Sequence, residues 1–152
     1  MDKRKILIVD YEPYVRRLIK RALDNGYIVL EASDGEEAIN ITRTEKPDLI
    51  LMDILMPNLD GYTACYEIKK EQATRAIPVI ILTSIGYELN KRLSQGMGAD
   101  GYRTKPFNLQ DLRDKVKQYQ LPKCQEAAEQ IQTNNAPNTY ESSSRILTLV
   151  ES

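Results

Sequence analysis

Short apolar runs alternate with longer amphipathic segments over most of the chain. Each run is only a few residues long and is rich in Ile, Leu and Val, a pattern typical of strands buried on both faces. The runs span Lys5–Asp10, Tyr27–Glu31, Asp48–Asp53, Ile77–Thr83 and, more weakly, Gly101–Arg103. The pattern predicts five strands.

The segments between these runs have helical spacing. In the first of them an apolar stripe runs from Val15 to Leu23, Pro13 suits the first turn and Gly26 suits the end. Weaker patterns predict helices over Gly35–Thr44, Thr63–Lys70 and Glu88–Gln95, and a last helix that carries Leu109, Leu112, Val116 and Tyr119 after an N-cap at Asn108.

The alternation of strands and helices predicts the fold class. Five βα units in succession favour an α/β fold in which a doubly wound, five-stranded parallel sheet has helices on both faces. The flavodoxin-like version of this fold has the strand order 2-1-3-4-5. That order would bring the first and third strands side by side.

The pattern ends after residue 120. Residues 121–152 are rich in Gln, Asn, Ser and Thr, a composition that buries too little apolar surface to offset the entropy of ordering. We therefore predict a domain over residues 1–120 and a polar, flexible tail over 121–152 without an output domain. Within the tail, Arg145–Val150 has strand-forming residues that could dock on the domain or on a partner, although an unstructured end with some hydrophobic residues is the favoured interpretation.

Composition narrows the class of protein. The chain is 41% hydrophobic and 28% charged, as soluble globular proteins are. Its formal net charge of -1 provides no field that favours nucleic acid or an anionic membrane, and no apolar run approaches the roughly 20 residues of a membrane span. Cys65 and Cys124 are too few for a disulfide framework and are expected as reduced thiols. We expect a cytoplasmic protein with neither nucleic acid nor membrane as its partner.

Polar residues interrupt the apolar runs at their carboxyl ends. Asp10 closes the first run, Asp53 the third and Thr83 the fourth, and Lys105 follows the fifth. In a doubly wound sheet, ligands bind beyond these ends, where the first and third strands are neighbours. Two carboxylates, a hydroxyl and an ammonium at one sheet edge suit phosphoryl transfer to a carboxylate. A single Asp at a strand end is more often a helix cap, but four such residues are harder to explain in that way.

These residues resemble the receiver domains of two-component response regulators over about residues 4 to 120. The resemblance is carried by ILIVDYEPYVRRLI, DLILMDILMPNLDGY, VIILTS and GADGYRTKPF, in this order along the chain. It implies that Asp53 accepts the phosphoryl group, that Thr83 and the aromatic Tyr102 switch with it, and that Lys105 binds the phosphoryl oxygens. Lys105-Pro106 resembles the family's cis peptide, and Pro57 and Gly61 fit its tight loop, although turn formation alone would explain both of these.

The sequence departs from the family at Tyr11. By the resemblance, Asp10, Asp53 and the backbone carbonyl of Leu55 would bind Mg²⁺, and a second acidic residue after Asp10 usually helps. Tyr11 stands at that position, and a phenol is not an anionic ligand near neutral pH. Glu12 is nearby but suits the helix N-terminus. The resemblance therefore implies weak Mg²⁺ binding.

We expect a regulatory domain, not an enzyme, apart from assisting its own phosphorylation and dephosphorylation. The resemblance implies a histidine kinase or phosphotransfer protein as phosphodonor. It implies output through a protein partner or a second copy of this chain. The face of the fourth helix, fifth strand and fifth helix is the candidate surface, over Tyr87–Gln95, Tyr102–Arg103 and Gln110–Gln118, although its charges are equally those of an ordinary solvated face. The alternative is a receiver-like binding module that works without phosphorylation.

Overall fold

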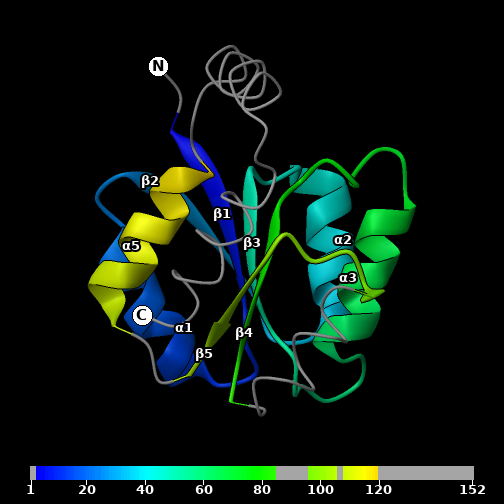
Figure 1. Cartoon of the computed structure of the whole chain (residues 1–152), viewed down its shortest axis with the longest axis horizontal. Coiled ribbons are helices and arrows are strands. Elements are labelled where there is room, and N and C mark those ends of the chain that lie inside the picture. The colour runs from blue at the N-terminus through cyan, green and yellow to red at the C-terminus, as the bar shows by residue number, and fades with distance from the viewer. Residues whose placement is uncertain (1–2, 85–95, 106–107, 120–152) are drawn as a thin grey trace, which may run out of the picture.

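A five-stranded parallel sheet lies between two layers of helices in the computed structural model, which describes residues 3–84, 96–105 and 108–119 (Figure 1). The elements are β1 (Arg4–Val9), α1 (Pro13–Leu23), β2 (Tyr27–Ala32), α2 (Gly35–Glu45), β3 (Leu49–Asp53), α3 (Gly61–Lys70), β4 (Val79–Thr83), β5 (Gly101–Thr104) and α5 (Leu109–Gln118). The strand order β2-β1-β3-β4-β5 confirms the predicted fold class. The predicted helix over Glu88–Gln95 and the tail over 121–152 lie outside the described residues.

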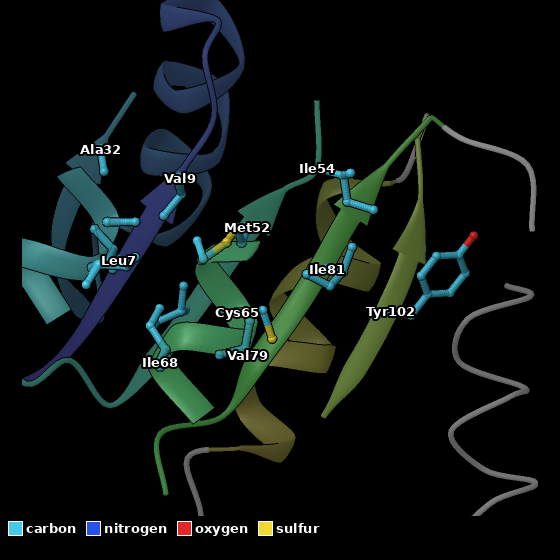
Figure 2. Close-up of a cluster of buried hydrophobic side chains, with 14 residues drawn as sticks. Leu7, Val9, Ala32, Met52, Ile54, Cys65, Ile68, Val79, Ile81 and Tyr102 are labelled. Atoms are coloured by element: carbon cyan, nitrogen blue, oxygen red, sulfur yellow. The ribbon is translucent and has the colours of Figure 1, made fainter. Parts of the chain in front are cut away.

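Each face of the sheet carries its own apolar cluster, because successive strand residues point to opposite sides. In β1, Leu7 and Val9 pack with α2 and α3, whereas Ile6 and Ile8 pack with α1 and α5. The same alternation runs through β3 and β4. Figure 2 shows the first cluster, in which Cys65 of α3 lies against the sheet. Burial on both faces explains why these strands read as continuous apolar runs.

Side-chain caps set where three of the helices begin. The side chains of Asp34, Asp60 and Asn108 accept hydrogen bonds from backbone N–H groups in the first turns of α2, α3 and α5. The cap at Asn108 was predicted. The cap at Asp60 explains why α3 begins at Gly61, before the predicted start at Thr63. None of the helices in the described part of the chain has the length and hydropathy that a membrane span requires.

The face formed by β5 and α5 buries two cations within the segments predicted as a partner surface. Arg103 is 4% exposed and lies 2.9 Å from the Asp111 carboxylate. Lys115 is 2% exposed and packs on Gly101, where a Cβ atom would lie 3.4 Å from Lys115 Cε. A Cβ atom on Gly101 would lie closer still, 2.9 Å, to the Tyr119 hydroxyl oxygen, so Gly101 lets both side chains pack against β5.

Candidate functional site

Two carboxylates meet at the carboxyl edge of the sheet. Asp10 directly follows β1, and Asp53 is the last residue of β3. The strands are paired, with Val9 opposite Met52, so the next residue on each strand lies at the same level. The topology therefore brings Asp10 and Asp53 together, as the sequence predicts.

Lys105 reaches both carboxylates from the end of β5. Its Nζ atom lies 2.7 Å from Asp10 Oδ2 and 3.6 Å from Asp53 Oδ2. The side chains of Asp10, Asp53 and Lys105 are 3%, 13% and 22% exposed, so the three charges interact with little screening by water. The shorter contact shows that the ammonium pairs mainly with Asp10, while Asp53 stays more open to solvent.

Backbone N–H groups hold the other oxygen of each carboxylate. Asp10 Oδ1 accepts a hydrogen bond from Glu12 N at 2.9 Å, and Asp53 Oδ1 accepts one from Ile54 N at 2.8 Å. The Oδ2 atoms of both residues point to the region shared with Lys105. The two carboxylates are thus fixed in orientation before any ligand binds.

The environment disfavours the charge on Asp53. Burial raises the pKa of its carboxyl group above the ordinary value, the Lys105 ammonium opposes that shift, and the Asp10 carboxylate adds to it. A cation bound here would stabilise the ionised form of Asp53. It would thereby offset both the cost of burying the charge and the repulsion from Asp10. The electrostatics of the site thus favour a cation beside Asp53.

Gly61 contributes through its lack of a side chain, a role that goes beyond the tight loop or turn that the sequence suggested for it. A Cβ atom on Gly61 would lie 2.0 Å from the Asp53 carbonyl oxygen, and Gly61 N donates to Ile54 O at 2.9 Å. The start of α3 therefore packs directly on the backbone that carries Asp53. No pattern in the sequence distinguishes this close approach from an ordinary loop glycine.

The predicted switch residues Tyr102 and Thr83 lie on β5 and β4, beyond β3 in the strand order. The Tyr102 ring is buried, 6% exposed, at the β5 edge of the cluster in Figure 2, and Thr104 Oγ1 donates to its hydroxyl at 3.3 Å. Thr83 ends β4 with its backbone opposite Thr104. The Thr83 side chain and Pro106 lie outside what the structure describes.

Tyr11 and Leu55 flank the site with side chains turned to solvent, 57% and 61% exposed respectively. Within residues 3–84, 96–105 and 108–119, no three His, Cys, Asp or Glu side chains come together as a metal site. At this edge of the sheet, the carboxylates that the structure places against Lys105 are those of Asp10 and Asp53.

Known proteins are similar to this chain in sequence and in fold. Residues 6–117 match the response regulator receiver domain. The chain is 41% identical over 116 residues to the probable transcriptional regulator ycf27 of Guillardia theta, an alignment covering 76% of this chain and 44% of that protein. The chain thus spans about half the length of the curated relatives it matches.

Solved structures give the same result. A putative response regulator from Chloroflexus aurantiacus superposes with a TM-score of 0.74 at 34% identity, covering 78% of this chain and 98% of that one. The receiver domain of the sensor histidine kinase PA1611 from Pseudomonas aeruginosa, with a magnesium ion coordinated in its active site cleft, superposes with a TM-score of 0.72 at 30% identity. That superposition covers 78% of this chain and 98% of the other.

The chain belongs to the response regulator receiver domain family, as its motifs predict. Receiver domains are regulatory modules, and this one is homologous to the receiver domains of response regulators and of sensor histidine kinases.

Proposed function

We propose that this receiver works in the cytoplasm and accepts a phosphoryl group on Asp53 from a histidine kinase or phosphotransfer protein. The observation that carries the proposal is the convergence of Asp10, Asp53 and Lys105, with Lys105 Nζ 2.7 Å from Asp10 and 3.6 Å from Asp53. The Asp53 carboxylate attacks phosphorus, and an acyl phosphate forms as the donor's bond to phosphorus breaks. Lys105 then stabilises the phosphoryl oxygens. Thr83 and Tyr102 are the proposed switch residues, and Lys105-Pro106 is the proposed cis peptide.

The donor set also suits Mg²⁺, which proteins hold through one or two carboxylates together with water and phosphate oxygens. Asp10, Asp53 and the Leu55 carbonyl are the proposed ligands. Both oxygens of Asp10 already accept hydrogen bonds, from Glu12 N and Lys105 Nζ. Together with the exposed Tyr11 side chain, this supports weak binding. When bound, the ion supplies positive charge to the phosphoryl oxygens.

Output would pass to a protein partner or a second copy of the chain through the face that includes β5 and α5. In the described part of that face, Arg103 and Lys115 are buried and offer a partner little surface. The exposed positions of α5 are better candidates, and they are Gln110, Arg113, Asp114, Lys117 and Gln118.

Intact mass after incubation with acetyl phosphate and Mg²⁺ tests the phosphoacceptor. Wild type should gain one phosphoryl group, and Asp53→Asn should gain none, because an amide is not a nucleophile of this kind. Asp24→Asn, at an exposed position at the end of α1, should label as wild type does. Undiminished acyl phosphate on Asp53→Asn would rule out the assignment.

The alternative function is a receiver-like binding module that works without phosphorylation. It is favoured by Tyr11, whose side chain points to solvent at the usual place of an acid. The pairing of Lys105 with both Asp10 and Asp53 argues against it, because a pure binding module would not need these three groups together. A wild-type protein that stays unlabelled at high Mg²⁺, yet binds its partner, would decide for the alternative.

A further inference from the structure

A guanidinium group lies behind the acidic pair, on the side of α1. Arg16 Nη1 donates to the carbonyl oxygens of Asp10 and Tyr11, and Arg16 Nε donates to Glu31 Oε1 at 3.1 Å. Its side chain is 16% exposed, whereas Arg17 beside it is exposed to solvent. One planar group therefore joins α1, the loop after β1, and β2.

Other hydrogen bonds fix the rest of this loop. Asp10 N donates to Ala32 O of β2 at 3.1 Å, and Glu12 N donates to Asp10 Oδ1 at 2.9 Å. Arg16 N donates to Glu12 O at 3.2 Å, which begins α1. The Arg16 side chain adds the bonds to the two successive carbonyls, so both peptide planes between Asp10 and Glu12 have a defined orientation. The orientation of the Asp10 carboxylate follows from that of its backbone.

We infer that Arg16 is a positioning residue of the phosphoacceptor site, an assignment that rests on the proposed function. By holding the carbonyls of Asp10 and Tyr11, it keeps the Asp10 carboxylate against Lys105 and beside Asp53. This placement matters more here than in a site with two loop acids, because Tyr11 provides no carboxylate and Glu12 is exposed. Displacement of a reacting group by about 1 Å can cost up to about 100-fold in rate.

The donor geometry and the positive charge of Arg16 could each contribute to positioning Asp10. The conservative variant Arg16→Lys distinguishes the two contributions. A lysine keeps the positive charge but cannot present the forked donors that reach two carbonyls and Glu31 together. We therefore expect Arg16→Lys to recover only part of the activity that Arg16→Met loses. Arg17→Met, at an exposed position of the same helix, is the matched control.

The test measures phosphorylation by acetyl phosphate at saturating Mg²⁺ over a range of donor concentrations. For Arg16→Met the maximum rate constant should fall about tenfold, because a misplaced carboxylate slows the step itself. The donor concentration at half-saturation and the urea midpoint should stay near the Arg17→Met values. Equal maximum rates for Arg16→Met and Arg17→Met would overturn the inference. So would full recovery by Arg16→Lys, because charge alone would then suffice.

A second measurement needs no phosphorylation. Amide hydrogen exchange at Glu12 N, which donates to Asp10 Oδ1, should be faster in unphosphorylated Arg16→Met than in Arg17→Met. Unchanged exchange would show that Arg16 does not fix the loop. Wild type that takes up no phosphoryl group would instead contradict the proposed function. If Arg16→Met does not fold, Glu31→Ala weakens the same arrangement from β2, with a smaller fall in rate expected, and an unchanged rate would again overturn the inference.

Discussion

At the scale of single residues, Tyr11 stands where the resemblance to the family predicts an acidic residue. Its carbonyl is held by Arg16, while its phenol ring is 57% exposed. The backbone therefore keeps an orientation useful to the site, although the side chain provides no anionic ligand. Asp10 and Asp53 remain as the carboxylates at this edge, and a cation would depend on them.

Tyr11→Asp should restore a carboxylate to the loop. We expect Mg²⁺ to bind several-fold more tightly and phosphorylation to become faster at limiting Mg²⁺, because a hard divalent cation gains an anionic oxygen ligand. Metal titration and acetyl phosphate kinetics on both proteins measure these changes. Tyr14→Asp, which adds the same charge at an exposed position of α1, should have a much smaller effect. If wild type matches Tyr11→Asp at every Mg²⁺ concentration, another group such as Glu12 completes the site.

At the scale of elements, the contact of α3 with β3 determines how Asp53 is presented. In Gly61→Ala, the new Cβ atom would lie 2.0 Å from the Asp53 carbonyl oxygen, so α3 must move away from the end of β3. We expect a loss of about 1–3 kcal/mol in the free energy of unfolding, as for other overpacked sites, together with slower phosphorylation. Urea denaturation and acetyl phosphate labelling measure the two effects.

Gly26→Ala is the control for this substitution, because a Cβ atom there meets nothing within 4 Å. It should leave the rate of phosphorylation unchanged. Equal stability and equal rates for the two alanine variants would mean that α3 adjusts without cost. The predicted role of Gly61 in presenting Asp53 would then be wrong.

The packing of α5 on β5 has a pH dependence that follows from Lys115. Burial, with a smaller contribution from Arg103, lowers the pKa of the Lys115 ammonium from 10.5 to about 8. Below about pH 8, Lys115 is charged in both the folded and the unfolded chain, and folding bears the full cost of burying it. As the pH rises from about 8 toward 10.5, the folded chain releases this proton while the unfolded chain keeps it, so the cost is progressively relieved.

Lys115→Met should therefore be more stable than wild type at neutral pH, and this difference should shrink above about pH 8. Urea denaturation across this range measures it, and Lys117→Met, exposed on the same helix, should show no such trend. The buried groups Cys65 and Tyr119, whose pKa values are raised to about 11 and about 12, are common to all three proteins and cancel in the comparison. A difference that does not change with pH would show that Lys115 is not a buried cation in solution.

The elements show what the sequence could and could not predict. Strands buried on both faces have a characteristic pattern, and parallel topology places their ends together, so Asp10, Asp53 and Lys105 could be assigned to one site. Arg16 and Lys115 could not be assigned in this way. Each lies on an amphipathic helix where a cation usually faces solvent, and each packs against a residue distant in sequence, Arg16 against Glu31 and Lys115 against Gly101. Local periodicity contains no information about such pairings.

At the scale of the whole molecule, the described members of the two apolar clusters run from Ile6 to Tyr119 and cover both faces of the sheet. The clusters contain every described element, from β1 to α5, and the acidic site lies at the edge of the sheet between them. The domain boundary after residue 120 stays a prediction from the sequence, and by it residues 1–120 should fold and react as one unit.

A chain truncated after Gln120 tests this boundary. We expect the same urea midpoint and the same rate of labelling by acetyl phosphate as for the full chain, because the described residues of the two clusters and the three charged groups of the site are retained. Docking of the strand-forming segment Arg145–Val150 on the domain would contradict this prediction. Truncation would then expose the surface that the segment covers, and the urea midpoint would fall. Ile146→Asp with Leu149→Asp in the full chain should then lower the midpoint equally, because buried carboxylates on the docked segment would be as unfavourable as its removal. An unchanged midpoint in both proteins would mean that the fold does not depend on the tail.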